Sequence, residues 1–441
     1  METVIRIIQF FMSLTLLVTV HEFGHFIMAR LFRIRVDKFY IFFDWGFSLF
    51  KFRRGETEYG MGWLPLGGYC QIAGMIDENQ GSKDLASEPQ PWEFRSKPAW
   101  QRFLVLVAGV TMNVILAFFI YCGISYAWGE QYLANEDVTR GYGYSFNADG
   151  ESLGFRDGDG IITINDEEIV NSAAILSRVI LAEDDLNVVV LRDGAPTGVT
   201  VPYEKINSLR QKEEFGQFCT VLHPFIIDSL VSDSAKASGL QKGDRIVGID
   251  GIDEVNFGSY AALLTERAGK AAELKVVRGQ EQLSVLVDVN AEGKIGVMTA
   301  ALPYTLRTKS YTLLQAIPAG ARLTGKTINN YWNQLKLIVK PDTGLYKQVG
   351  GFIAIGKIFP GSWDWHAFWS MTAFLSIILA IMNIIPIPGL DGGHTLFTLW
   401  EMITRRKVSE HVLEIAQYVG LVLLLALMLF ANGNDIYRLF K

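Results

Sequence analysis

The chain has few cysteines, few charges and no excess of positive charge. Its three cysteines stand far apart among 441 residues and form no CxxC pair, which excludes a disulfide framework and a thiolate metal site. Acidic residues outnumber basic ones by 46 to 40, and this balance argues against a nucleic-acid partner. The N-terminal apolar run lacks a small-residue cleavage site, so the sequence does not predict a cleaved signal peptide.

Apolar residues make up 50% of the chain, whereas charged residues make up 20%. The apolar residues gather in four long runs, at residues 7–32, 103–128, 368–386 and 412–431. About 20 apolar residues in a helix cross the hydrocarbon core of a bilayer, which is roughly 30 Å thick. The sequence therefore predicts a polytopic α-helical membrane protein with four transmembrane helices.

The charges beside these runs predict their orientation. The segment after the first run is rich in arginine and lysine, and the short connection between the third and fourth runs contains Arg405, Arg406 and Lys407. Cytoplasmic loops of membrane proteins are enriched in these residues, so both segments are expected in the cytoplasm. Both termini and the long segment between the second and third runs are then expected on the opposite side.

The first run contains an HExxH motif, HEFGH at residues 21–25. His21 and His25 lie one helical turn apart and can bind one Zn²⁺, and Glu22 is then placed to accept a proton from water at the metal. Ionisable residues are costly in hydrocarbon, which favours a functional site over a chance match. A helix rises about 21 Å from Ile7 to His21, so the metal is expected within the membrane towards its cytoplasmic face. Alternatively, the helix ends early and the histidines are interfacial.

A catalytic zinc usually has three protein ligands, so a third ligand is needed. Asp391 is the strongest candidate, because it follows the third run in the segment NIIPIPGLDGGH and no comparable intramembrane acid is evident. Pro386 and Pro388 break the helix there, and irregular backbone at membrane depth is tolerated where it lines a polar cavity. The alternative is an ordinary helix exit at which Asp391 caps the next helix.

Residues 33–102 are more than a linker. Tyr40–Phe52 is rich in aromatic and β-branched residues, and the glycine-rich stretch Gly60–Tyr69 follows a charged turn. This pattern predicts strands joined by a turn. The strands either present an edge to which an extended substrate strand adds or form a purely structural hairpin.

The segment 129–301 alternates short apolar runs with turn signals and contains a weak internal repeat. Ser152–Asn165 and Ala237–Gly251 each carry Gly-Asp before a β-branched strand that ends in Asn or Asp. The two units resemble tandem PDZ domains, which bind extended peptides by strand addition. The alternative is that they are bulky gates that bind nothing.

Between residues 310 and 339, apolar residues recur on helical faces and predict an amphipathic helix. This helix either lies on the membrane surface or packs as a linker on the second PDZ-like unit.

Together, HEFGH, NIIPIPGLDGGH and the PDZ-like units resemble the site-2 protease family of intramembrane zinc metalloproteases, in its bacterial regulator of sigma-E branch. Residues 54–69 and 94–102 match the family as well, so the resemblance covers nearly the whole chain. One departure is Phe352, which follows Gly350-Gly351 where the family often has Gly-Gly-Pro.

The resemblance implies a zinc endopeptidase of the bacterial inner (plasma) membrane, with its active site near the cytoplasmic face and its PDZ domains extracytoplasmic. Its substrates would be single-span membrane proteins, such as trimmed anti-sigma factors or remnant signal peptides. The implied residues are the zinc ligands His21, His25 and Asp391, the catalytic base Glu22, and the substrate contacts Asn113, Asn383, Gly67 and Gly68. Two rival functions are an intramembrane metal transporter and an inactive PDZ scaffold.

The expected order of domains follows from these assignments. It is transmembrane helix 1 at 1–32, a membrane-associated β-region at 33–102, transmembrane helix 2 at 103–128, PDZ-like α+β domains at 129–213 and 214–305, an amphipathic connection at 306–363, transmembrane helix 3 with the motif loop at 364–408, and transmembrane helix 4 with the C-terminal tail at 409–441.

Overall fold

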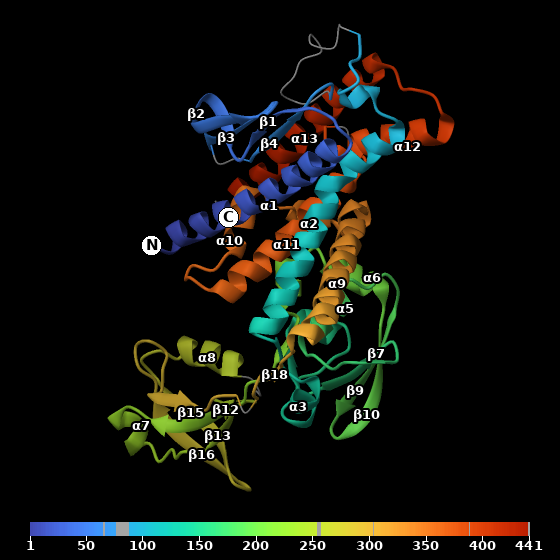
Figure 1. Cartoon of the computed structure of the whole chain (residues 1–441). Coiled ribbons are helices and arrows are strands. Elements are labelled where there is room, and N and C mark those ends of the chain that lie inside the picture. The colour runs from blue at the N-terminus through green and yellow to red at the C-terminus, as the bar shows by residue number, and fades with distance from the viewer. Residues whose placement is uncertain (65–66, 76–87, 254–256, 303, 388, 440–441) are drawn as a thin grey trace. The chain divides into compact units, whose positions relative to one another are not determined.

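The structure is a computed structural model that describes residues 1–64, 67–75, 88–253, 257–302, 304–387 and 389–439. The chain forms two compact units (Figure 1). The first comprises Met1–Glu130, Ser310–Val339 and Tyr346–Lys441, and the second comprises Gln131–Lys309 and Lys340–Leu345. Three segments that are far apart in the sequence therefore build the first unit.

Four helices in the described part of the first unit are long and apolar enough to cross a membrane, and they coincide with the four expected spans. They are α1 (Glu2–Leu31), α2 (Ala99–Ala127), α11 (Trp365–Ile384) and α13 (Glu410–Leu439). Because α1 continues to Leu31, the expectation of an early end to this helix is wrong, whereas the depth of the histidine pair in the membrane stays a prediction. The remaining helical segments are α9 (Leu313–Val339), α10 (Phe352–Ile358), α12 (Asp391–Thr404), and the short 3₁₀ helices η2 (Phe94–Ser96) and η5 (Leu345–Gln348).

Helix α2 is the centre of the first unit, because α1, α9, α11 and α12 all pack on it. Helix α1 comes close where Gly24 faces the backbone of Ala108, since a Cβ at position 24 would lie 2.5 Å from the Ala108 carbonyl oxygen. Ala117 of α2 and Ile377 of α11 belong to one buried apolar core. Small residues at such contacts let membrane helices approach closely.

Helix α9 packs its apolar face, with Leu323, Ile328 and Leu335, on the core between α2 and α11. Thr327 also hydrogen-bonds Tyr121 of α2 over 3.2 Å. The segment is therefore part of the first unit, where it packs on α2 and α11. Its placement at the membrane surface stays a prediction.

The expected strands between α1 and α2 form a four-stranded sheet. Its members are β1 (Val36–Tyr40), β2 (Phe43–Arg54), β3 (Thr57–Leu64) and β4 (Tyr69–Ile72). Their order is β2-β3-β1-β4, with β1 and β3 parallel and the other pairs antiparallel. Among the described residues β4 pairs only with β1, so it is an edge strand, and the choice between the two expected roles of the sheet stays a prediction.

The connection between α11 and α13 contains a helix, α12, where a motif loop was expected. Pro386 lies just beyond the end of α11 at Ile384, and α12 begins at Asp391. The acid in the first turn favours this second start, because negative charge is stabilised at a helix N-terminus. Arg102 of α2 donates to Glu401 of α12 over 2.6 Å in a largely buried ion pair, which fixes α12 on α2.

Helix α13 extends beyond the apolar run predicted at 412–431 and brings a second buried acid into the candidate span. Asp435 is 5% exposed and accepts a hydrogen bond of 3.0 Å from the backbone N–H of Ala354 in α10. The expectation that Asp391 is the only acid of this kind is therefore wrong. Asp435 already has a backbone partner, so Asp391 remains the candidate metal ligand.

The second unit contains two modules with separate buried cores. The first core includes Phe215 and Phe218, and strand β11 pairs with β6, so this module extends beyond the expected boundary at 213. The elements of the first module are α3 (Asn135–Arg140), β6 (Tyr144–Phe146), α4 (Ala148–Ser152), β7 (Gly160–Ile164), β8 (Glu167–Glu168), α5 (Ala173–Ile180), β9 (Leu186–Arg192), β10 (Ala195–Val201), α6 (Tyr203–Leu209), η3 (Glu213–Gln217) and β11 (Cys219–Val221).

The second module is built on a sheet of order β16-β15-β13-β12-β17, with β14 paired to β13. Its elements are β12 (Phe225–Leu230), α7 (Asp233–Ala237), β13 (Arg245–Ile249), β14 (Ile252–Asp253), α8 (Phe257–Glu266), β15 (Ala271–Arg278), β16 (Glu281–Asp288) and β17 (Val297–Thr299). Outside the modules, β5 (Glu130–Tyr132) pairs with β18 (Arg307–Lys309), and Pro341–Thr343 forms the short helix η4.

A buried aspartate bound by an arginine organises the first module. Arg192 donates to both carboxylate oxygens of Asp159, over 2.8 and 2.7 Å, and also to the carbonyl of Gly154. The aspartate is the one in the Gly-Asp pair of the sequence pattern. This contact joins the turn before β7 to the end of β9.

The second module contains the same arrangement. Arg278 donates to both oxygens of Asp244, each over 2.7 Å, and to the carbonyl of Gly239. Asp244 is fully buried, and its hydrogen bonds with the Arg278 guanidinium hold its pKa below the ordinary value of an aspartate. The pair therefore stabilises the folded module above the ordinary aspartate pKa of about 4, and this contribution is lost as the pH falls through the lower folded pKa.

We expect Asp244→Asn to destabilise the second module, because the amide cannot accept both charge-assisted bonds. Hydrogen exchange of β13 and β15 in the full-length protein should accelerate, and the melting temperature of the module should fall by roughly 5 °C. Glu292→Gln is the matched control, since its exposed pair with Lys294 contributes little. Equal exchange in both variants would contradict a stabilising role for the buried pair.

Candidate metal centre

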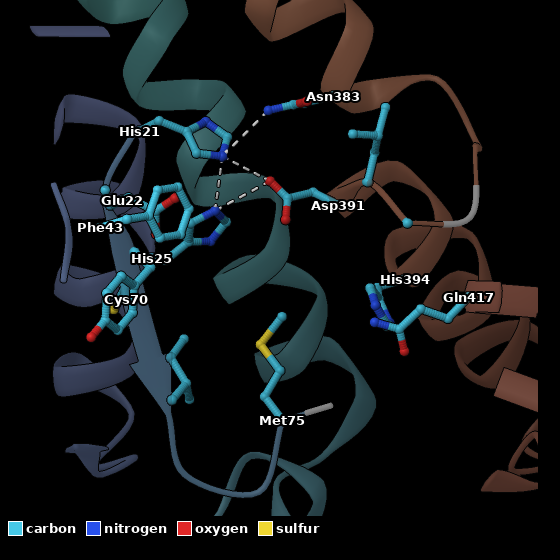
Figure 2. A pocket seen from close by; sticks show the side chains of 15 residues that line it. His21, Glu22, His25, Phe43, Cys70, Met75, Asn383, Asp391, His394 and Gln417 are labelled. Carbon is cyan, nitrogen blue, oxygen red and sulfur yellow. Dashed lines mark hydrogen bonds and ion pairs between the residues drawn. The ribbon is translucent and has the colours of Figure 1, made fainter. Parts of the chain in front are cut away.

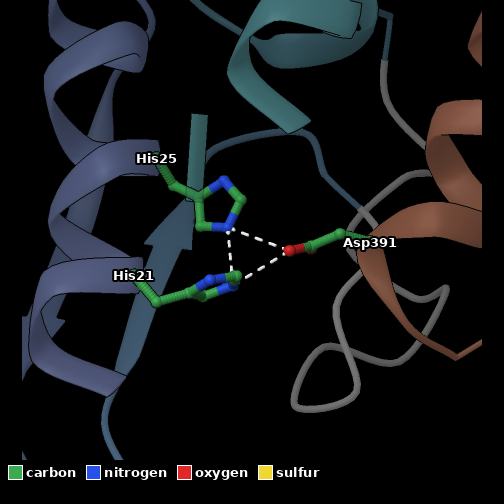
Figure 3. A group of neighbouring side chains, drawn as sticks. All are labelled: His21, His25 and Asp391. Atoms are coloured by element: carbon green, nitrogen blue, oxygen red, sulfur yellow. Dashed lines mark hydrogen bonds and ion pairs between the residues drawn. The ribbon is translucent and has the colours of Figure 1, made fainter. Parts of the chain in front are cut away.

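The structure brings together the three side chains that the sequence predicted as metal ligands (Figure 3). His21 and His25 project from the same face of α1, and Asp391 reaches them from the first position of α12. Asp391 Oδ2 lies 2.9 Å from His21 Nε2 and 3.2 Å from His25 Nε2, and the two Nε2 atoms are 3.2 Å apart. Both histidines are only 6% exposed.

The chemistry of this set fits a divalent metal ion. Apart from the two imidazoles, the buried Asp391 Oδ2 has no hydrogen-bond donor in the described part of the chain. Two imidazole nitrogens and a carboxylate oxygen that converge on one point are electron-pair donors, and a shared cation removes their mutual repulsion. Ligands about 2 Å from a tetrahedral zinc are roughly 3.3 Å apart, close to the observed separations. Three protein ligands also leave one coordination position open.

Contacts behind the imidazoles orient their metal-facing nitrogens. His25 Nδ1 lies 2.8 Å from the carbonyl of Val105, which can only accept, so Nδ1 carries the proton and Nε2 is free to bind a metal. His21 Nδ1 lies 3.3 Å from the amide of Asn113, whose Oδ1 is buried without a partner. Rotating that amide by 180° places Oδ1 against the Nδ1 proton of His21 and satisfies both groups.

Gly109 of α2 is a site residue that the sequence reasoning missed. A Cβ at position 109 would clash with His25 Nε2 and would lie 2.7 Å from His21 Cε1. Only glycine therefore lets α2 pack directly against the two imidazoles. No motif marks this glycine, because the requirement comes from a second helix that is far away in the sequence.

The metal-ligand set opens into a cavity of about 210 Å³ (Figure 2). Glu22 lines this cavity, and the backbone N–H of Cys70 in β4 hydrogen-bonds its carboxylate. The edge strand β4 thus borders the cavity beside the predicted base. The other lining residues are His21, His25, Phe43, Gly68, Tyr69, Cys70, Ile72, Met75, Asn383, Gly389, Leu390, Asp391, His394 and Gln417.

The expected substrate contacts occupy different places. Asn383 lines the cavity, with its amide nitrogen 3.4 Å from His21 Nε2. Gly68 lines it too, whereas Gly67 is not among the lining residues. Asn113 is fully buried behind His21. The structure therefore places Asn383 and Gly68 in the wall of the cavity and Asn113 behind a predicted metal ligand.

Two further polar residues line the cavity and were not predicted from the sequence. His394 lies one turn after Asp391 in α12, and Gln417 comes from the fourth membrane helix, α13. A polar amide inside the apolar run 412–431 is a signal that could have pointed to Gln417.

Comparison with known proteins identifies the family of the chain. A sequence model of peptidase family M50 matches residues 9–427. The chain is 29% identical to the regulator of sigma-E protease of Salmonella typhimurium over 98% of each chain. It is 28% identical to a Xylella fastidiosa protein named "Putative zinc metalloprotease", over 96% of this chain and 97% of that protein. A Vibrio cholerae protein of the same name is 29% identical over 98% of each chain. Because the match extends over nearly its whole length, the chain belongs to peptidase family M50, the site-2 protease family.

Proposed function

We propose that this protein is an intramembrane zinc endopeptidase that cleaves transmembrane segments of single-span membrane proteins. The observation that carries the proposal is the convergence of His21, His25 and Asp391 beside Glu22 in one cavity among candidate membrane helices. The names of the relatives, which include zinc metalloproteases and a regulator of sigma-E protease, support zinc as the metal and proteolysis as the reaction.

Zinc, when bound by the two histidines and the aspartate, would polarise the scissile carbonyl and make the attacking water more acidic. Glu22 accepts the proton of that water and later returns it to the leaving amine. The Cys70 N–H holds the Glu22 carboxylate in place for this transfer. Val105 and Asn113 keep the two imidazoles in the orientation that binds the metal.

The substrate must be extended before it is cut, because a helix hydrogen-bonds its own carbonyl groups. Within the described part of the chain β4 has a partner strand only in β1, and its other side could pair with an extended segment by strand addition. Gly68 lets the chain approach β1 closely just before β4 begins, since a Cβ there would meet the carbonyl of Tyr40. The position of β4 in the cavity wall beside Glu22 supports this role for the sheet.

The sheet itself is suited to a membrane-associated position. Strand β2 presents a row of exposed apolar side chains, and Trp45 is 80% exposed. An apolar patch of this kind is typical of a surface that contacts lipid or protein. The members of the patch are Trp45, Phe47, Leu49, Phe50 and Phe52.

We propose that the two modules of the second unit are tandem PDZ-like domains on the extracytoplasmic side of a bacterial inner membrane. Their shared arginine–aspartate arrangement supports descent from one repeated unit. Modules on that side would take no part in the chemistry at a site near the cytoplasmic face. Instead, they would restrict access to substrates whose extracytoplasmic part has been trimmed, such as anti-sigma factors or remnant signal peptides.

Glu22→Gln should keep zinc and fold but lower the cleavage rate by at least about 100-fold, because an amide cannot accept the proton. The measurement is cleavage of a tagged single-span protein in proteoliposomes, with zinc content determined in parallel. A metal transporter or an inactive PDZ scaffold would have no need of this base. Substantial residual cleavage would remove Glu22 as the base, and metal uptake without cleavage in the wild type would favour the transporter.

Gly109→Ala should weaken zinc binding by at least roughly tenfold, because the new methyl group displaces both imidazoles. Gly123→Ala is the matched control, since a Cβ at that position of the same helix meets open space. Asp391→Ala should lose zinc as well. Metal analysis of the purified proteins decides the outcome, and full zinc occupancy in Gly109→Ala would show that the imidazoles do not depend on this glycine.

Replacing residues 131–309 by a flexible linker should preserve cleavage of a trimmed substrate and newly permit cleavage of the untrimmed one. The physical reason is steric, since a bulky domain is excluded where a short stub is not. The two substrates are compared side by side in membranes. Loss of both cleavages with zinc retained would identify the modules as recruiters or supports and would rule out the access filter.

A further inference from the structure

The cavity at the metal-ligand set has a polar wall that the proposed mechanism leaves unused. His394 and Gln417 line the cavity from α12 and α13, on the side away from Cys70 of β4 in Figure 2. Neither side chain has a hydrogen bond or ion pair with any residue that the structure describes. Both residues are partly exposed, so their polar groups are accessible to a ligand in the cavity.

The position of Gln417 strengthens this argument. It belongs to a helix whose 26-residue segment His411–Ile436 is apolar enough to cross a membrane. A polar side chain in such a helix is costly, and it usually faces a functional cavity. Gln417 does face the cavity of the metal-ligand set, and its amide offers both donors and an acceptor.

An extended substrate would need groups of this kind. Successive residues of a strand direct their N–H and C=O groups to alternate sides, so a segment paired with β4 satisfies only half of its main chain. The other half points away from β4, and peptide groups that are buried there without a partner carry a penalty. The neutral imidazole of His394 and the amide of Gln417 each provide a donor and an acceptor.

We propose that His394 and Gln417 form a main-chain subsite that binds the face of the extended substrate directed away from β4. The subsite would hydrogen-bond the peptide groups of the substrate and not its side chains. One enzyme could therefore accept transmembrane segments of differing sequence. This inference rests on the proposed proteolytic function and assigns the second wall of its substrate cleft.

The test uses the full-length protein and three tagged single-span substrates that differ in the side chains around the cleaved bond. Gln417→Met keeps the length of the side chain but removes its hydrogen-bonding groups, and His394→Leu does the same for the imidazole. Each should raise KM roughly tenfold with little change in kcat, because binding of the main chain is lost equally in the ground state and the transition state. His394→Gln should restore most of the wild-type KM. Tyr418→Phe is the control, since Tyr418 is exposed and outside the cavity lining.

Binding is measured separately in the Glu22→Gln background, where the same substrates are not cut. Gln417→Met should weaken their affinity by the same factor for all three, with zinc content and melting temperature unchanged. An unchanged affinity, a loss of zinc, or a factor that varies with the substrate side chains would overturn the main-chain subsite. If wild-type protein bound these substrates without cleaving them, the proteolytic function would fail while the binding comparison would still test the subsite.

Discussion

The close packing of α1 against α2 is the constraint on which the metal-ligand set depends. Gly24 brings the two helices together at the backbone of Ala108, and Gly109 gives the imidazoles of α1 a flat surface to lie against. In that position His25 reaches the Val105 carbonyl and His21 reaches the Asn113 amide. A larger residue at either glycine would separate the helices or displace the imidazoles. The packing of α1 on α2 thus fixes the positions of the two histidine ligands and determines which ring nitrogen of each carries the proton.

The third ligand depends on a different set of contacts. Asp391 stands at the first position of α12, and a Cβ at Gly392 would clash with the carbonyl of Ile385. The start of α12 is therefore held against the end of α11. Further along, the Arg102–Glu401 ion pair fixes α12 on α2. Because α2 also carries the surface for the histidines, one central helix contributes to the position of all three donors.

The two modules of the second unit are stabilised by contacts within each module. Each has its own apolar core, and each joins the turn before one strand to the end of another through a buried aspartate. Such modules fold on their own contacts and need nothing from the metal-ligand set. This separation is consistent with a division in which the membrane helices carry the chemistry and the modules govern access to it.

The sequence by itself determined the features that rest on local spacing. The i, i+4 pair of His21 and His25, the four apolar runs and the two Gly-Asp patterns could be read directly, because helix period and hydropathy are properties of neighbouring residues. Asp391 could be named because a third donor was needed and few intramembrane acids were available. What only the tertiary structure decided involves partners remote in sequence. Gly109 matters because α1 lies on it, Asp435 has a backbone partner in α10, and His394 and Gln417 share a cavity because two helices place them there. No local pattern marks such residues, since their roles are set by side chains and backbone that the chain brings close only when it folds.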